Sequence, residues 1–430
     1  MKPMRNYLTP LIKITALIFL ASFLLAGCWS RKELNELSIV VGLGLEKTEE
    51  GFTVSVQIVN PGQVLTKRSA GSAQSPVVVF KEKGATIPEA LARMTTQVPR
   101  RLYFAHLRIV IFGEKLAHSG LSHAIDYMSR NREMRSDFYL VVTHGTTPFE
   151  VLTMFSAIDP IPANNMFSKL QTSDEQWAAT GKLTVDQLMK GLTSSGKNPA
   201  MTGIEIIGNA GKGDKPIDST APAAIMRYYG MAAFNRDRMV GWLDENETKA
   251  LNYIQNSTHQ TIGFIECPRG KEKANEKAHE KSNEKSNEKA NGKTNGNGKI
   301  SVQVMKSHTT IKAHLKGDVP SFDVYTRLEQ DIADIECDAD VLDPSFLEEL
   351  NRKSEQKVEE LLAKAIHKAQ HQLHSDIFGF GQVLHRRYPK FWKTVEEWDN
   401  LFAQSEIRVH VEFNTHRFGT IMQSINHETR

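Results

Sequence analysis

The stretch Ser38-Ile-Val-Val-Gly-Leu-Gly-Leu45 is an apolar run with the length of a buried β-strand. Residues 52–59 alternate between apolar and polar as a partner strand does, and the polar residues 46–51 predict the turn between them. We therefore expect a hairpin. Gly42 and Gly44 lack the third glycine and the following helix of a phosphate-binding loop, so they predict close backbone packing instead.

Strands and helices alternate after this hairpin, which predicts an α/β or α+β arrangement for the first part of the chain. The expected strands here are 107–112, 138–143, 203–208, 226–234 and 239–243. The expected helices are 86–96, 114–129, 147–155, 183–192 and 244–255.

The last part of the chain predicts a second set of strands around a long helix. The expected strands are 262–267, 300–305, 310–315, 322–337 and 407–413, the helix is 344–376, and a second apolar stripe covers 391–402. The whole chain predicts an α+β protein of several mixed-sheet domains with packed helices. We expect a signal peptide at 1–27, an N-terminal domain at 28–190, a middle domain at 191–299 and a C-terminal domain with the long helix at 300–430.

Leu25-Ala-Gly-Cys28 closes an apolar run that begins at Ile14 and follows a basic start. This is the layout of a secretory signal, and its cysteine predicts the acylated first residue of a bacterial lipoprotein. The alternative is a retained transmembrane anchor. A spanning helix needs roughly 20 apolar residues, and Lys13 leaves only 14–26, so we favour lipidation of Cys28.

The composition of the 430 residues is that of a globular protein, 40% hydrophobic and 24% charged. Lys and Arg total 53 and Asp and Glu total 50, and three of the basic residues lie in the leader, so the mature chain is near neutral. This excludes a strongly basic nucleic-acid footprint. Of the three cysteines, Cys267 and Cys337 remain after Cys28, and whether they form a disulfide stays open.

Residues 271–299 repeat a four-residue unit of the Asn-Glu-Lys-Ala type without one bulky apolar side chain. Like charges four residues apart would repel on a helix, and glycines end the segment, so the repeat predicts disorder. Expected strands flank it, so it reads as a surface insertion.

The residues that could carry chemistry do not form a catalytic set. Ser194 and Lys197 have a Ser-x-x-Lys spacing, but the partner motifs of penicillin-recognising enzymes are absent. His367, His371 and His374 recur along the long helix, where a solvated helix flank is a better interpretation than a zinc site. We expect no catalytic, metal or cofactor-binding residues.

Several short stretches occur together in the order typical of one protein family. They are Leu25-Ala-Gly-Cys28-Trp29, Glu33-Leu34, Val41-Gly-Leu-Gly44, His106, Arg108, Val110, Phe112-Gly-Glu114, Arg130, Glu133, Arg135, Ala233-Phe234, Val240-Gly241, Leu243, Glu247, Asp376-Ile-Phe-Gly379, Tyr388-Pro389, Trp392 and Trp398. On these residues the sequence resembles the C subunits of bacterial spore germinant receptors, the Ger(x)C lipoproteins of endospore formers. It departs from the family at Ser30, where Asp commonly stands, and at the 271–299 insertion.

The resemblance implies a non-enzymatic receptor subunit with three α+β domains. Such a subunit would be anchored through Cys28 on the outer face of the spore inner membrane, beside a membrane-embedded A subunit and a transporter-like B subunit. The receptor would sense nutrients and start germination. The alternative function is the solute-binding lipoprotein of a transporter, which needs a cleft between two similar lobes.

Overall fold

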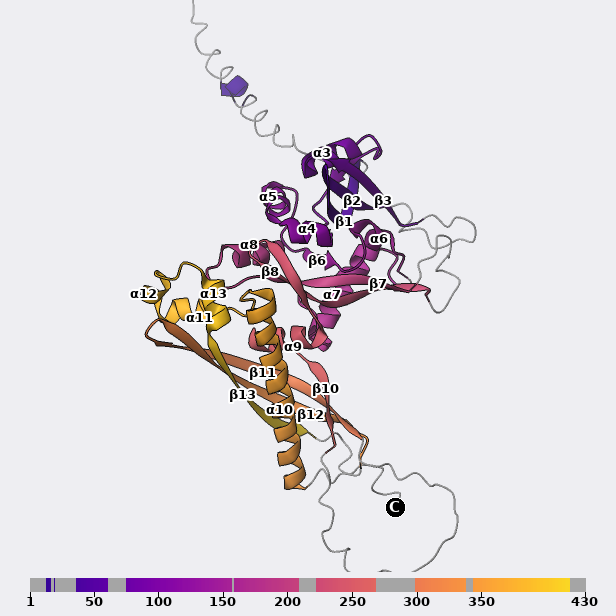
Figure 1. The fold of residues 1–430 in the computed structure, drawn as a ribbon. Helices are drawn as coiled ribbons and strands as arrows, with labels where there is room; N and C mark the ends of the chain where they lie inside the picture. The colour runs from indigo at the N-terminus through magenta and orange to yellow at the C-terminus, as the bar shows by residue number, and fades with distance from the viewer. Residues whose placement is uncertain are drawn as a thin grey trace, which may run out of the picture.

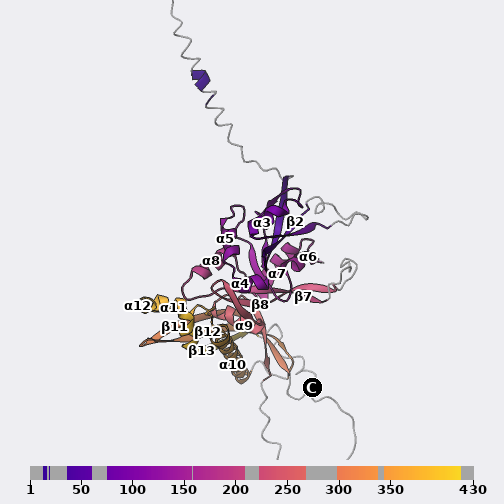
Figure 2. The ribbon, with the colours of Figure 1, turned by 45° about the horizontal axis from the view of Figure 1, so that its top comes forward.

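The computed structural model describes residues 13–16, 19, 36–60, 75–156, 158–208, 222–267, 298–337 and 343–417. Its described elements are arranged around two β-sheets. In both views of the ribbon, the indigo and magenta elements of the first sheet lie at one end and the orange and yellow elements of the second lie at the other (Figures 1 and 2). Within the described part of the chain, no helix has the length and apolar character needed to cross a membrane.

The larger sheet has nine strands within the described residues, in the order β3-β2-β1-β5-β6-β7-β8-β9, with β4 paired to β1. Parallel pairs (β1 with β5, β5 with β6, β6 with β7) occupy its middle, and antiparallel hairpins form both ends. The strands are β1 (Leu37–Thr48), β2 (Gly51–Val59), β3 (Val77–Gly84), β4 (Arg101–Tyr103), β5 (Ile109–Phe112), β6 (Tyr139–Thr143), β7 (Ala200–Gly208), β8 (Ala224–Asn235) and β9 (Arg238–Leu243).

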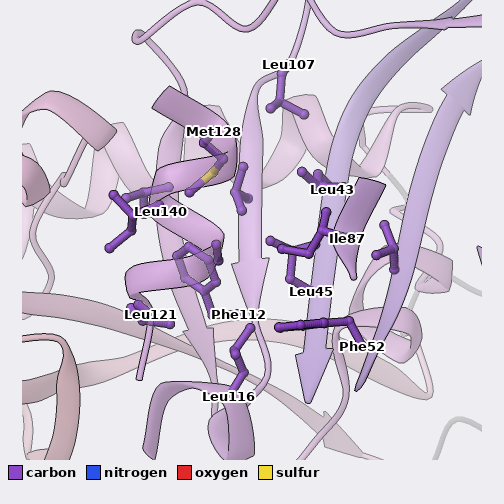
Figure 3. Close-up of a cluster of buried hydrophobic side chains, with 14 of the residues drawn as sticks. Leu43, Leu45, Phe52, Ile87, Leu107, Phe112, Leu116, Leu121, Met128 and Leu140 are labelled. Atoms are coloured by element: carbon purple, nitrogen blue, oxygen red, sulfur yellow. The ribbon is translucent and has the colours of Figure 1, made fainter. Parts of the chain in front are cut away.

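Helices cover both faces of this sheet. On one face α3, α4, α5 and α8 enclose the main core, part of which is drawn in Figure 3. On the other face α6 and α7 enclose a second apolar cluster. The helices are α3 (Ile87–Met94), α4 (Glu114–Ser119), α5 (Ser122–Arg130), α6 (Pro148–Thr153), α7 (Pro162–Gln176) and α8 (Val185–Thr193).

The predicted hairpin of residues 38–59 is confirmed as the antiparallel pair β1 and β2. Its glycines have the predicted packing role, because a Cβ on Gly42 would lie 2.7 Å from the Leu152 side chain and one on Gly44 would lie 2.7 Å from Pro148. The missing side chains let α6 lie directly on β1. No phosphate loop is involved.

The predicted helix over 114–129 is wrong as a single element. The structure has two helices there, α4 and α5, separated at Gly120, whose φ of 117° is open to glycine and strained for other residues. The backbone N–H of Leu121 bonds instead to the carbonyl of Asp237, 2.9 Å away, in the turn between β8 and β9. This long-range bond interrupts the helix.

The smaller sheet has four strands within the described residues, in the order β10-β11-β12-β13, and helices pack against its inner face, the face that contributes to an apolar core. The predicted strands 300–305 and 310–315 are one strand, β11, which pairs with β12 along its whole length. The elements are α9 (Glu245–Ile254), β10 (Thr261–Glu266), β11 (Lys299–Lys316), β12 (Val319–Ile335), α10 (Pro344–Lys368), α11 (Phe380–Arg387), α12 (Pro389–Trp392), α13 (Trp398–Gln404) and β13 (Glu406–Arg417).

The predicted helix over 344–376 is shorter in the structure. The α-helix α10 ends at Lys368, a π-helical turn covers Ala369–Leu373, and His374 adopts a left-handed conformation with φ of 47°. Gln370, buried in this turn, donates to the carbonyl oxygens of Phe402 and Ser405 at 2.8 and 2.9 Å. The wide π-helical turn points the Gln370 amide toward Phe402 and Ser405, and the chain changes direction after it.

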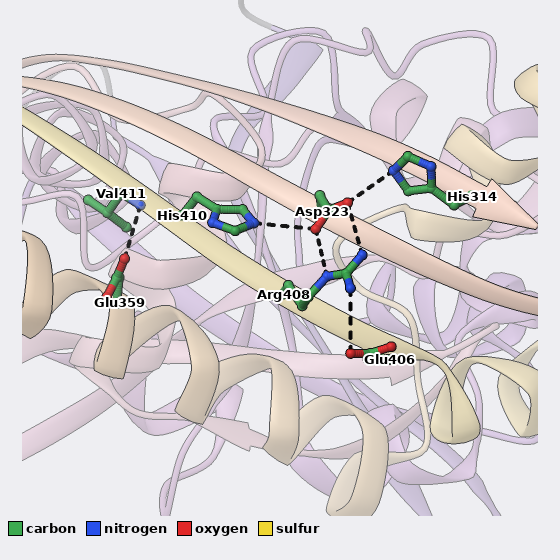
Figure 4. Close-up of polar contacts among 7 residues, drawn as sticks. All are labelled: His314, Asp323, Glu359, Glu406, Arg408, His410 and Val411. Carbon is green, nitrogen blue, oxygen red and sulfur yellow. Dashed lines mark hydrogen bonds and ion pairs between the residues drawn. The ribbon is translucent and has the colours of Figure 1, made fainter.

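Helix α10, together with Lys249 of α9, caps both edge strands of the smaller sheet with side chains of opposite charge. Glu355 and Glu359 accept the backbone N–H groups of β13 at Phe413 and Val411, over 3.0 and 3.3 Å; the second of these bonds is drawn in Figure 4. On the opposite edge, lysine side chains from α9 and α10 donate to the outward carbonyls of β10. These bonds run from Lys249 to Ile262, from Lys357 to Phe264, and from Lys353 to Glu266 and Cys267.

Cys267 and Cys337 form a disulfide in the structure. Cys267 follows directly after β10 and Cys337 lies two residues after β12, and both strands pair with β11. The backbone N–H of Cys267 also bonds to the carbonyl of Gly298 at 3.0 Å, so the described chain on either side of the 271–299 insertion is held together at its base. Most of the insertion lies outside the described residues.

Candidate functional site

The residues singled out in the sequence do not come together at one place. Cys28, the predicted lipidation site, lies outside the described residues. Ser194 and Lys197 lie in the loop between α8 and β7, and this loop packs against the segment that follows α10. That contact joins the two sheets, and we call it the junction: residues 194–199 and 234–236 on one side, and 374–382 with 398–399 on the other.

Asp376 is the centre of the junction and is fully buried. Its Oδ1 accepts the backbone N–H groups of residues 378–380 over 2.7 to 3.2 Å. Its Oδ2 accepts the N–H of Gly381 at 2.8 Å and the indole Nε1–H of Trp398 at 2.9 Å. The carboxylate therefore caps the first turn of α11 and fixes the orientation of a tryptophan.

Burial raises the pKa of Asp376 to about 6, against the opposing effect of the hydrogen bonds from the backbone and from Trp398. Lys197 lies close by; burial lowers the pKa of its ammonium group, and the charge of Asp376 works in the other direction. Five donors occupy the two carboxylate oxygens, and no part of the side chain reaches solvent. A substrate could not reach this carboxylate, which makes it a structural group.

Two glycines let the backbones from either side of the junction meet. A Cβ on Gly196 would lie 2.6 Å from the backbone of Gly381 and 2.7 Å from the Trp392 ring. A Cβ on Gly381 would lie 2.6 Å from Gly196 and 2.7 Å from Trp398. The N–H of Gln382 donates to the carbonyl of Gly196 at 3.1 Å. Only glycine fits on both sides of this contact.

Further hydrogen bonds cross the junction around Asp399. Asn198 and Asn235 both donate to its carboxylate, over 3.3 and 3.0 Å. The Asn198 N–H donates to the carbonyl of Asp376 at 2.7 Å, and the Ser375 hydroxyl donates to the carbonyl of Phe234 at 2.6 Å. One apolar cluster also runs through both sheets, because Met231, Ala233 and Leu243 of the larger sheet pack with the core of the smaller one.

The Ser-x-x-Lys spacing has a structural explanation in this setting. The Ser194 hydroxyl accepts a hydrogen bond from the Gln382 side-chain amide at 2.5 Å, and Lys197 lies beside Asp376 and Gly379. Serine and lysine therefore contact the opposite side of the junction.

The histidine row does not assemble a metal site in the described part of the chain. The rings of His367 and His371 lie 4.4 Å apart between centroids, whereas His374 has left the helix. Among the described residues, no group of three or more His, Cys, Asp or Glu side chains could hold a metal ion.

A second polar cluster ties β13 to the hairpin of β11 and β12 (Figure 4). The Asp323 carboxylate accepts the Arg408 guanidinium at 2.8 Å and contacts His314 and His410 at 3.0 and 3.3 Å. The hydrogen bond from Arg408, followed by that from His410, holds the pKa of Asp323 down to about 2. The Arg408, His314 and His410 side chains are about half exposed, which is typical of a solvated sheet face holding a parallel strand pair in register.

Comparison with known proteins gives consistent matches over both halves of the chain. Residues 30–206 match the family described as "Spore germination protein N-terminal domain". Residues 229–419 match "Spore germination B3/ GerAC like, C-terminal". The chain belongs to the Ger(x)C family. The family resemblance expected from the sequence is thereby confirmed, and the two mixed sheets with their helices confirm the expected α+β fold.

Two relatives of this Ger(x)C chain match it over almost their whole length. Spore germination protein KC of Bacillus subtilis is 27% identical, with 96% of this chain and 98% of the relative covered. Spore germination protein B3 of Bacillus subtilis is 21% identical, with 94% and 98% covered. A solved structure, the crystal structure of the GerBC protein, aligns over 87% of this chain and 96% of its own with a TM-score of 0.48 and 16% identity.

Of the residues that carried the family resemblance, several converge at the junction. Asp376-Ile-Phe-Gly379, Trp398 and Ala233-Phe234 lie apart in the sequence, but the Trp398 indole donates to Asp376 here, and the Phe234 carbonyl accepts a hydrogen bond from Ser375 beside it. Sequence reasoning missed their partners, Gly196 and Gly381, and the role of Asp376 as an acceptor. One signal was present: Asp376 stands three residues before Gly379, the residue at the start of a helix, and such an Asp can accept backbone N–H groups of the chain that turns into the helix.

Proposed function

We propose that this Ger(x)C chain is the lipid-anchored, non-enzymatic C subunit of a spore germinant receptor. It acts on the outer face of the spore inner membrane through contacts with the membrane-embedded A and B subunits, and it is required for germination triggered by a nutrient. The observation that carries this proposal is the match to spore germination protein KC, which covers nearly the full length of both chains.

The junction supports a role in assembly. A buried carboxylate with every acceptor position used, two facing glycines and a shared apolar cluster hold the two sheets in one fixed arrangement. A rigid body of this kind can present surfaces from both halves to partners at once. The alternative role, a solute-binding lipoprotein of a transporter, needs two similar lobes, and the described sheets differ in size and strand order.

Replacing Cys28 tests the anchor. The Cys28→Ala variant is expected to leave the spore membrane fraction and to lose nutrient-triggered germination, because a diacylglyceryl group at this residue would be the attachment. The measurements are immunoblots of fractionated spores and germination across a nutrient panel. The variant Cys267→Ala/Cys337→Ala, which keeps Cys28, should remain in the membrane fraction. Full germination by a membrane-bound Cys28→Ala protein would overturn the anchor.

The subunit role has its own test. Deleting the gene should abolish germination to at least one nutrient while leaving vegetative growth unchanged, and the tagged lipoprotein should co-purify from spore membranes with an A-type and a B-type partner. Normal germination of the deletion strain across the panel would argue against a receptor subunit.

A further inference from the structure

A cavity of about 350 Å³ lies beneath α9 and α10, against the inner face of the smaller sheet. Its volume is within the range of small-molecule sites. The walls are mostly apolar, with Val302 and Val304 from β11, Leu361 from α10 and Phe413 from β13. The chemistry of the cavity comes from the few polar groups that share this lining.

Two lysines in the lining carry positive charge to this apolar cavity: Lys249 is buried, whereas Lys357 is exposed. Lys249 is only 8% exposed; its Nζ lies 3.4 Å from the centroid of the Trp177 ring and donates to the carbonyl of Ile262 at 3.2 Å. The Lys357 Nζ lies 3.6 Å from the centroid of the Phe264 ring and donates to the carbonyl of that residue at 2.6 Å. Each ammonium group uses one of its three hydrogen atoms in the bond to a backbone carbonyl, and an aromatic face stabilises its charge further.

The charges around these lysines do not cancel within the described part of the chain. Burial lowers the pKa of Lys249 to about 8; Glu245 opposes this effect and the charge of Lys357 adds to it. Burial also lowers the pKa of Lys357, with Glu266 and Glu360 opposing and Lys299 adding. Among the described residues, neither lysine has a carboxylate within ion-pair distance. The lining holds the buried Lys249, the exposed Lys357 and one carboxylate, Glu245, so positive charge is in excess there, which favours an anionic ligand.

The cavity lining also includes an unsatisfied acceptor. Gln330 is fully buried, and its Nε2 donates to the hydroxyls of Ser354 and Thr415 at 3.1 Å each. Its Oε1 has no hydrogen-bond partner within the described residues. A buried amide oxygen without a donor costs free energy, which a ligand N–H or O–H group could recover.

We propose that this cavity is a binding site for a small carboxylate with an apolar body and a hydrogen-bond donor. The carboxylate binds Lys249 and Lys357, the body fills the space under α10, and the donor meets Gln330. The site lies within the smaller sheet and its helices, apart from the junction, and the inference does not depend on the lipid anchor.

Indole-3-propionate is a suitable probe, because it combines a carboxylate, an apolar ring and an N–H donor. The full chain is reconstituted in phosphatidylcholine nanodiscs and titrated by calorimetry, with empty nanodiscs as the blank. We expect saturable binding. The neutral amide of the probe should bind at least about tenfold more weakly, as expected for loss of a charge-assisted contact. The 1-methyl derivative, which lacks the donor, should also bind more weakly.

Three variants assign the binding to the cavity. Lys249→Met and Lys357→Met keep the apolar stem and should each weaken binding about tenfold, without changing affinity for the neutral amide. Gly263→Leu should abolish binding, because a Cβ there meets nothing closer than 3.9 Å and points to the buried side of β10. The matched control is Lys353→Met, which removes the same kind of lysine-to-β10 bond outside the cavity lining and should bind as the wild type does.

The outcomes separate cleanly. Absence of saturable binding to the wild type would overturn the proposal, as would equal affinity for the probe and its amide. Binding unchanged in Gly263→Leu, with a thermal midpoint equal to that of the wild type, would place the probe elsewhere and would also overturn it.

Discussion

Burying Asp376 is unfavourable in free energy, yet the N–H groups around it need its carboxylate as an acceptor. Moving a carboxylate out of water is unfavourable, and the rise of its pKa to about 6 reflects that cost. The same side chain accepts four backbone N–H groups and one indole N–H that would otherwise be buried without partners. Removing the carboxylate is therefore expected to lower the free energy of unfolding.

The variant Asp376→Asn tests this balance through pH. An amide cannot accept at both positions, so the N–H of Gly381 and the indole of Trp398 lose their acceptor, and we expect a loss of about 2–4 kcal/mol in the free energy of unfolding at pH 4.5. The wild-type carboxyl has a folded pKa above its unfolded value of 3.8, so ionisation destabilises the folded wild type as pH rises from about 4 to about 6.

The advantage of the wild type over Asp376→Asn should therefore shrink between pH 4 and pH 7, by up to about 3 kcal/mol. Urea unfolding followed by tryptophan fluorescence at a series of pH values measures it. A difference that stays constant or grows with pH would show that burial does not govern this carboxyl.

At the scale of the element, the 271–299 insertion interrupts a hairpin that is complete without it. Glu266 pairs with Lys299 in the register of β10 and β11, and Cys267 bonds to Gly298 just beyond them. Replacing residues 268–297 by Asn-Gly should leave the thermal midpoint unchanged or higher, because a shorter loop loses less entropy on closing.

Germination should also survive the replacement of 268–297, since the insertion departs from the family pattern. Calorimetry and germination assays in spores measure the two outcomes, and a shuffled insertion of the same length and composition serves as the control. A folded replacement protein that fails to support germination, beside a functional shuffled one, would assign a role to the segment.

How well the elements could be predicted depended on where their stability comes from. The hairpin of residues 38–59 could be predicted because most of its side chains are buried and many are apolar. Helix α7 was missed because its sequence, PANNMFSKLQTSDEQ, is largely polar and only a narrow stripe is buried. The length of β11 was missed because its polar residues face solvent, and its pairing with β12 is a backbone property.

The junction was harder to predict from the sequence than the helices and strands were. Its contacts join residues more than 100 positions apart, as with Ser194 and Gln382, so no local periodicity reports them. Gly196 and Gly381 need to be glycine only because of each other. The Ser-x-x-Lys spacing could be rejected as catalytic from missing partners, but its structural role required the fold.

For the whole molecule, the junction predicts that the two sheets unfold together. The predicted domains 28–190, 191–299 and 300–430 remain a proposal, and the described strands of the middle segment divide between the two sheets. One apolar cluster and a dense set of hydrogen bonds join those sheets. A disruptive substitution at the junction should therefore destabilise both sheets.

Gly196→Ala is such a substitution, because the alanine Cβ would meet the Gly381 backbone and the φ of 85° at this position disfavours alanine. We expect a loss of about 2–4 kcal/mol, the sum of backbone strain and overpacking. Hydrogen exchange should rise in β7 and in β12 alike. Gly145→Ala, with a φ of 64° and no atom within 4 Å, controls for strain alone and should cost about 1–2 kcal/mol. Faster exchange confined to one sheet would show that the sheets unfold separately.

The capping of β10 and β13 by α10 limits how this end of the protein can recruit others. Strand donation, in which a partner extends a sheet through its open backbone, needs free N–H and C=O groups along an edge. Glutamates of the chain itself already accept two N–H groups of β13, and lysines already donate to carbonyl groups of β10. A partner would then recognise this end of the protein through its surface side chains. Single substitutions on the surface can therefore change partner preference without altering the fold.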